Sequence, residues 1–172
     1  MTGELILAIT IPSLIVFAAV YFTFRQYHQH QMRTQMIDNR KVKDTITMPL
    51  RLQAYERLIL LCERIDFADL MLRLKTPGTT ARELEAALLV TVQQEYEHNL
   101  TQQLYVTPEL WQVLLAAKAK TMDFIALARQ GLPDDATSDD YAKRLFEILS
   151  NESSLPSLIG KKAIKTEASL WL

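Results

Sequence analysis

The longest uninterrupted hydrophobic stretch of the chain covers residues 5–24 and reads LILAITIPSLIVFAAVYFTF. It contains no charged side chain, and Glu4 and Arg25 stand immediately outside its two ends. A helix of this length spans about 30 Å, which is the thickness of the hydrocarbon core of a bilayer. The pattern therefore predicts an N-terminal transmembrane helix, preceded by a short extracytoplasmic tail at residues 1–4.

Two other structures could account for the same hydrophobic stretch. A cleaved signal peptide would need a basic N-terminal region, a shorter apolar core and small residues before the cleavage site. The tail has no basic residue, and the large side chains of Tyr21, Phe22 and Phe24 occupy the region where cleavage would fall. A buried helix of a soluble domain would seldom lack charge on every face. We therefore expect an anchor that stays on the mature chain.

The basic residues nearest to this stretch all follow it. They are Arg25, Arg33, Arg40, Lys41 and Lys43. By the positive-inside rule, this places residues 25–172 in the cytoplasm and the N-terminus outside. The lone cysteine, Cys62, cannot form an intrachain disulfide and fits a reducing compartment. We expect a single-pass protein of the inner (plasma) membrane.

Residues 25–47 are polar and contain neither glycine nor proline. Their apolar positions are too sparse for a packed core but fit a helix that continues out of the membrane as a juxtamembrane stalk. Sustained heptads are missing, so a coiled coil is not expected. The stalk carries a net charge of +3, whereas residues 48–172 carry −3. The basic part of the chain is therefore the part next to the lipid.

From residue 48 onward, hydrophobic positions recur at helical spacing. Helices are predicted from Pro49 through Ile65 and over about residues 67–74, 81–99, 108–130 and 139–150. Thr80, Thr107 and Ser138 are expected to cap three of them. Residues 48–150 thus form a small all-α bundle. Residues 151–172 are expected to be either a short helix or a mobile tail.

Two segments of the bundle, LRLQAYERLILLCERI and QQEYEHNLTQQLYV, carry a resemblance to a known family. They resemble an uncharacterised family of membrane-anchored helical proteins of Bacteroidota, known only as a domain of unknown function. The resemblance extends from the apolar anchor to about residue 130. It implies a single N-terminal span and a cytosolic helical domain, and it brings no activity, ligand or catalytic residue.

The second of these segments contains Glu95 and His98, whose i, i+3 spacing puts a carboxylate and an imidazole on one helix face, as in di-iron bundles. Such a site needs two of these motifs and two further glutamates. The chain has one Glu-x-x-His motif, and its other histidines, His28 and His30, would point about 200° apart on a helix and cannot share one ion. No metal or other cofactor is expected.

A structural polar cluster is the interpretation that we favour for this segment. Its expected members are Arg51, Glu95, His98, Asn99 and Gln102, with Arg73 as a further candidate. In this interpretation His98 forms a hydrogen bond across a helix interface. Replacing His98 with alanine would then leave its partner unsatisfied, at a cost of about 1–3 kcal/mol.

These observations favour a membrane-tethered scaffold or adaptor whose helical domain binds a protein partner, which could include a second copy of the chain. The lipid bilayer is the other partner, through residues 5–24. The formal net charge of −1 gives no sign of nucleic-acid binding. No complete catalytic constellation is present, so an enzyme is not expected. The alternative is a bundle that binds a metal or small ligand, and could be an enzyme, through Glu95 and His98.

Overall fold

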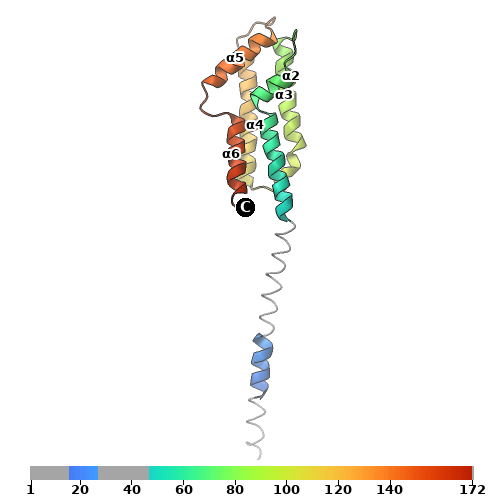
Figure 1. The fold of residues 1–172 in the computed structure, drawn as a ribbon, viewed down its shortest axis with the longest axis vertical. Coiled ribbons are helices and arrows are strands. Elements are labelled where there is room, and N and C mark those ends of the chain that lie inside the picture. The colour runs from blue at the N-terminus through green and yellow to red at the C-terminus, as the bar shows by residue number, and fades with distance from the viewer. Residues whose placement is uncertain (1–15, 27–46, 172) are drawn as a thin grey trace, which may run out of the picture. The chain divides into compact units, whose positions relative to one another are not determined.

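The computed structural model describes residues 16–26 and 47–171 (Figure 1). The chain divides into two compact units, Met1–Thr47 and Met48–Leu172, and each is considered by itself. The described residues form helices and connecting turns, and the only extended pairing among them is one isolated bridge. The all-α class that the sequence predicts is therefore confirmed for this part of the chain.

In the first unit, residues 16–26 form a helix whose large apolar side chains are exposed. The hydroxyl of Thr23 donates a hydrogen bond to the carbonyl of Ala19, 2.7 Å away. Within the described residues, no helix is both long enough and apolar enough to cross a membrane. Residues 5–15 of the expected span lie outside the described part.

Other predictions for the first unit fall on residues outside the described part of the chain. The tail at residues 1–4 and most of the expected stalk, residues 27–46, lie outside them, as do His28 and His30.

The second unit starts in a helix that ends at residue 64, here called the 48–64 helix. The elements that follow are α2 (Phe67–Leu74), α3 (Ala81–His98), the 3₁₀ helix η1 (Leu100–Leu104), α4 (Pro108–Arg129), α5 (Ser138–Ser150) and α6 (Pro156–Ala168). The chain is already helical at residue 47, before the expected start at Pro49. Leu104, expected to form a brief extended link with Tyr105 and Val106, is instead the last residue of η1.

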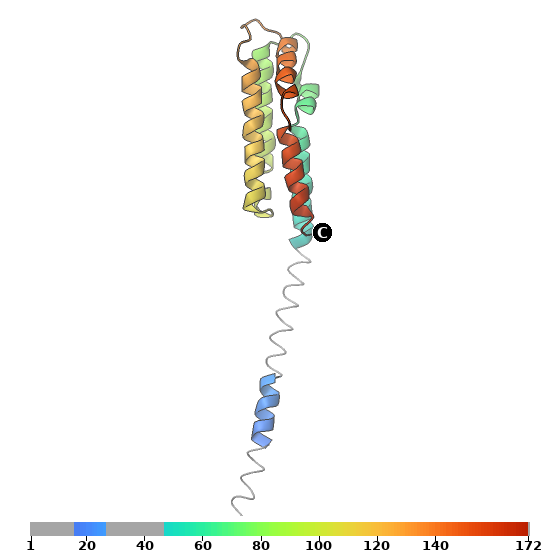
Figure 2. The ribbon, with the colours of Figure 1, turned by 90° about the vertical axis from the view of Figure 1, so that its left-hand side faces the viewer.

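The core of the second unit forms around α4, which packs against α3, α5 and α6. The 48–64 helix runs beside α6, as both views show (Figures 1 and 2). The largest fully buried side chains include Leu58, Leu88, Ile125, Tyr141, Leu145 and Ile164. Each such leucine or isoleucine contributes about 1.5–3 kcal/mol by leaving water. The hydrophobic faces predicted from the sequence supply most of this core.

Two neighbouring helix starts, those of α3 and α5, are built in the same way. Thr80 accepts a hydrogen bond from the backbone N–H of Glu83 at 3.2 Å, and the Glu83 carboxylate accepts one from the Thr80 N–H at 2.9 Å. Thr137 and Asp140 repeat this reciprocal capping box at the start of α5. The cap of α5 is thus Thr137, one residue before the expected Ser138.

An isolated antiparallel bridge joins Thr80 to Thr137, so the two capping boxes lie side by side. Hydrogen bonds from the Thr80 backbone and side chain hold the pKa of Glu83 below its usual range. The side chain and backbone of Thr137 do the same for the pKa of Asp140. Each carboxylate therefore stays charged beside the partly positive N-terminus of its own helix.

Residues 151–172, expected to be either a short helix or a mobile tail, contain the helix α6 (Pro156–Ala168). The compact unit extends through these residues, and α6 contributes to its core. Ile164 on α6 is almost completely buried. Gly160 brings α6 so close to the 48–64 helix that a Cβ atom there would lie 2.8 Å from Cys62 Sγ. Small residues on the inner face let this lysine-rich helix pack closely.

Candidate functional site

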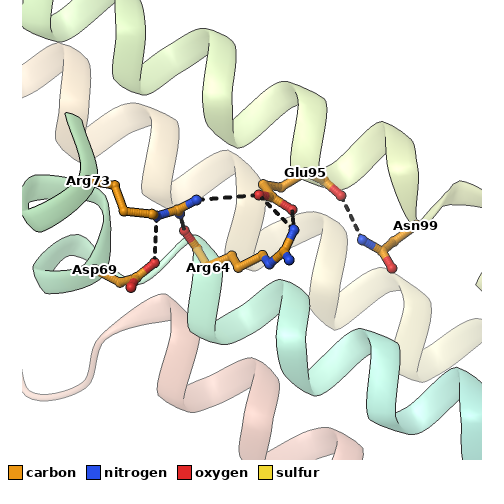
Figure 3. A network of polar contacts seen from close by, with 5 residues as sticks. All are labelled: Arg64, Asp69, Arg73, Glu95 and Asn99. Carbon is orange, nitrogen blue, oxygen red and sulfur yellow. Dashed lines mark hydrogen bonds and ion pairs between the residues drawn. The ribbon is translucent and has the colours of Figure 1, made fainter.

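The most highly connected polar side chain among the sequence candidates is Glu95, near the end of α3 and 8% exposed (Figure 3). Arg64, at the end of the 48–64 helix, donates from Nη1 to both carboxylate oxygens, at 3.3 Å to Oε1 and 3.2 Å to Oε2. Arg73, in the last turn of α2, approaches the same carboxylate with Nη1 3.6 Å from Oε1. Glu95 therefore ties together three helices.

The second arginine is itself held in place from both sides (Figure 3). Arg73 Nε lies 2.8 Å from Asp69 Oδ2, one turn earlier on α2. Its Nη2 donates to the backbone carbonyl of Arg64, one of the carbonyls at the helix end that lack a partner within the helix. This arrangement alternates charge from Asp69 through Arg73 and Glu95 to Arg64, and so each charged group has a partner.

Of the expected polar cluster, the structure brings together Glu95 and Asn99, with Arg73. Asn99 Nδ2 donates to the backbone carbonyl of Glu95 at 2.8 Å, and so closes the end of α3. Gln102 is buried nearby, but its side chain donates to Thr101 Oγ1 at 3.2 Å. Arg64, which was not among the sequence candidates, takes the place expected for Arg51.

Arg51 and His98 lie outside this network. Arg51 precedes Arg64 by thirteen residues, which is about 20 Å along a helix, so it cannot reach Glu95. Its guanidinium Cζ lies instead 3.9 Å from the centroid of the Trp171 ring. His98 is exposed in the last turn of α3, where the expected hydrogen bond across a helix interface does not form.

The pairing of Glu95 argues against metal chemistry at this place. A cation would have to displace two guanidinium groups from the carboxylate, and His98 faces solvent. Among the described residues, no group of three or more histidine, cysteine or acidic side chains could hold a metal ion. The network is thus suited to fixing the angle between helices.

A second buried carboxylate, Glu167 on α6, was not among the candidates. Its Oε1 accepts from the Tyr55 hydroxyl at 2.9 Å and from the Thr107 backbone N–H at 3.1 Å, and its Oε2 accepts from the Thr107 hydroxyl. Thr107 is the N-cap of α4, so the carboxylate lies at the partly positive end of that helix. Burial, with the hydrogen bond to Glu167, raises the pKa of Tyr55 to about 12.

The signal for a buried Glu167 in the sequence is weak. The run KKAIKTEA carries three lysines, which makes it look like a solvated segment. The positions that face inward are Gly160, Ile164 and Glu167, of which only one is a large apolar residue. Their spacing of four and then three residues is that of a helix face, and this spacing could have marked Glu167 as buried.

Surface grooves border α6 on several sides. One, between α4 and α6, has a volume of about 700 Å³ and is here called the α4–α6 groove. Its apolar lining is formed by Leu110, Val113, Leu158, Ile159, Ala163 and Leu170. Another, of about 510 Å³, lies between the 48–64 helix and α6 and is lined by Leu52, Ile59, Leu60 and Ala168 among others.

The larger groove exposes large apolar side chains. Leu158 is 49% exposed, Ile159 42% and Leu170 76%. Glu109 on α4 and Lys162 on α6 add one charge of each sign to its lining. An apolar floor with charged walls is the form taken by grooves that receive an amphipathic helix.

Comparison with known proteins gives one match. The model of a family described as a family of unknown function (DUF7935) matches residues 4–170. No curated protein and no solved structure matches the chain.

Proposed function

The chain belongs to the DUF7935 family, whose function is unknown, and we propose from its own geometry that it is a membrane-tethered helical scaffold that binds a protein partner at the cytoplasmic face. The observation that carries this proposal is the α4–α6 groove. Its exposed leucine and isoleucine side chains gather apolar surface in one groove, which is typical of interaction sites. Glu167 joins α6 to the start of α4 and so holds together the two helices that form this surface.

The membrane tether is proposed from the uncharged run of residues 5–24 and from the basic residues that follow it. Part of this run is described, and its properties fit a lipid environment. Phe17 and Phe22 are exposed on the helix of residues 16–26. The bond from Thr23 to the carbonyl four residues earlier satisfies the hydroxyl within the helix, as a span in lipid requires. The location would be the inner membrane of a bacterial cell.

A metal- or ligand-binding bundle is the weaker candidate. It relied on Glu95 and His98, and the carboxylate of Glu95 is already neutralised by Arg64 and Arg73. His98 would also have to turn inward to share a ligand with it. The groove has no such conflict, because its apolar side chains have no competing partner to displace.

Photo-crosslinking of the full chain in its own membrane tests the scaffold. A benzophenone amino acid at Ile159, in the groove, is expected to give a discrete protein adduct. The same group at Leu72, which is 85% exposed on α2 and lies outside the groove, is the matched control. The acidic variant Val113→Glu should abolish the Ile159 adduct, because a charge on the groove floor would have to be desolvated.

The proposal fails if the adducts at Ile159 and Leu72 are the same, or if Val113→Glu leaves the Ile159 adduct unchanged. It also fails if gentle extraction recovers only a free monomer with a co-purified metal or small molecule.

A further inference from the structure

We propose that the occupant of the α4–α6 groove is the same groove of a second copy of this chain. This inference rests on the proposed function, because it names the partner of the proposed binding surface. In space, charged and apolar residues follow one another in the same order along α4 and α6. The register of these two helices is fixed by the contacts between them.

Two contacts show that α4 and α6 run antiparallel. At one end, the Thr107 N–H at the start of α4 donates to Glu167 near the end of α6, at 3.1 Å. Toward the other end, Lys120 Nζ on α4 lies 3.2 Å from Glu152 Oε2, just before α6 begins. Residue 107 is thus level with residue 167. Because the two helices run in opposite directions (Figure 2), residue numbers increase along α4 as they decrease along α6.

This register places the groove residues in two layers. Distances along the helices are counted here from the level of Thr107 and Glu167, at 1.5 Å of rise per residue. The charged layer holds Glu109 at about 3 Å and Lys162 at about 7.5 Å. The apolar layer follows, with Val113 at about 9 Å and Ile159 at about 12 Å. Glu109 and Val113 share a face of α4 because they are four residues apart, and Ile159 and Lys162 share a face of α6 at three. Both helices therefore present a charged layer followed by an apolar layer, in the same direction.

The charges of the first layer are available to a partner. Glu109 and Lys162 are both exposed, and among the described residues neither takes part in an ion pair. The neighbouring Lys161, in contrast, has its Nζ 3.0 Å from Glu63 Oε1. Glu109 and Lys162 thus bring one charge of each sign, unpaired within the described part of the chain, to the groove lining.

A two-fold axis parallel to α4 and α6 makes the groove complementary to itself. In an isologous interface, if residue i of one copy meets residue j of the other, then j meets i as well. Such an axis keeps every residue at its own level, so Glu109 of each copy lies about 4.5 Å along the axis from Lys162 of the other, within reach of these two long side chains. Val113 of each copy likewise faces Ile159 of the other. Opposite charges and apolar side chains are matched twice.

The same axis suits copies held in one membrane. It leaves both Met48 ends at the same end of the pair, as two copies anchored through their N-terminal segments require. A helix of a different protein could also fill an apolar groove. The groove itself, however, carries charges of both signs in an order that matches a second copy of the groove, and this favours self-association.

Charge reversal tests this pairing. Glu109→Lys and Lys162→Glu are each introduced into the full chain in vesicles, with donor and acceptor dyes at an added Gln94→Cys. Each variant alone should self-associate about tenfold more weakly, because two contacts between opposite charges become two contacts between like charges. A mixture of the two variants should recover the energy transfer of the unaltered chain, because every Lys then faces a Glu.

Matched controls are Asp135→Lys and Arg57→Glu, which make the same charge changes at exposed positions outside the groove. Both should leave energy transfer unchanged. The inference is overturned if the chain gives no transfer, if the groove variants alone match the unaltered chain, or if the mixture does not recover. If self-association fails in this way while the Ile159 adduct with another protein persists, the scaffold stands and only the identity of its partner is wrong.

Discussion

Gly160 on α6 lies against Cys62 on the 48–64 helix so closely that no side chain fits between them. A Cβ atom at residue 160 would lie 2.8 Å from Cys62 Sγ and 3.3 Å from Leu114 Cδ2. The glycine thus sets the distance between the first and last helices of the bundle. Gly160 is needed because it lets the two helices approach closely. Its backbone is helical, a conformation that any residue can adopt.

Gly160→Ala should therefore destabilise the unit of residues 48–172. The overpacking costs about 1–3 kcal/mol, which outweighs the gain of about 1 kcal/mol in helix propensity. Removing the sulfur should relieve the clash, so Cys62→Ala and Gly160→Ala together should cost less than the sum of their separate effects. Urea unfolding of the three variants measures this. Additive losses would show that the two residues are not in contact.

The hydrogen bonds that Glu167 accepts predict that replacing this residue has a large effect on the free energy of unfolding. Glu167→Ala should destabilise the unit by about 1–3 kcal/mol, because the Tyr55 hydroxyl and the Thr107 N–H lose their acceptor. Glu167→Gln keeps one acceptor oxygen and the side-chain volume, so it should cost less. Thermal unfolding compares them. Equal stability of the alanine variant and the original would contradict the role of Glu167.

Glu95 and His98 should now respond very differently to substitution. Glu95→Ala should cost about 1–3 kcal/mol, since it breaks the links to Arg64 and Arg73 at a largely buried position. His98→Ala should change stability by less than about 0.5 kcal/mol, because the side chain is exposed. Unfolding curves with metal analysis of the same samples decide this. A metal ion lost in both variants would restore the ligand-site interpretation.

Stability should fall at alkaline pH partly through Cys62. Burial raises the pKa of its thiol from 9.0 to about 12; nearby Lys161 lowers it slightly. Because the folded pKa exceeds the unfolded one, the stabilising contribution is complete below pH 9 and is lost as the pH rises toward 12. The free energy of unfolding between pH 8 and pH 11 should thus decline less steeply in Cys62→Ala. Parallel curves would contradict this.

The orientation of the proposed anchor predicts the behaviour of a reporter. Alkaline phosphatase fused after Leu172 should be inactive, since the C-terminal unit would remain in the cytoplasm. Replacing the five basic residues of the stalk with glutamine should weaken that preference and raise the activity. The matched control replaces five basic residues of the C-terminal unit. An active fusion to the unaltered chain would reverse the proposed topology.

The helices could be predicted from sequence because large apolar residues recur at helical spacing from Leu58 to Leu149. The strong local signals also hold, such as the capping box of Thr80 and Glu83. The last helix was not assigned to the core, because Gly160 and the small residues around it bury surface without a hydrophobic pattern.

The polar cluster was predicted only in part, for a different reason. Periodicity places Glu95 on a helix, and it gives no distance to side chains on other helices. Arg64 reaches Glu95 because it stands at the end of its helix that lies beside the end of α3, whereas Arg51 lies at the far end of the same helix. The turn after residue 65 lets Arg73 on α2 reach the same carboxylate. Ion pairs between helices depend on how the helices are arranged, so their partners follow from the fold.

The hydrogen bond from Tyr55 to Glu167 joins residues 112 positions apart in the chain. Contacts of such long sequence separation can form only after the intervening chain is in place, and they slow folding. Because the acceptor is residue 167, the ribosome must have released the chain at least as far as α6 before Tyr55 gains this partner. The N-terminal segment is made first. Insertion of the nascent chain into a membrane would therefore precede closure of the bundle.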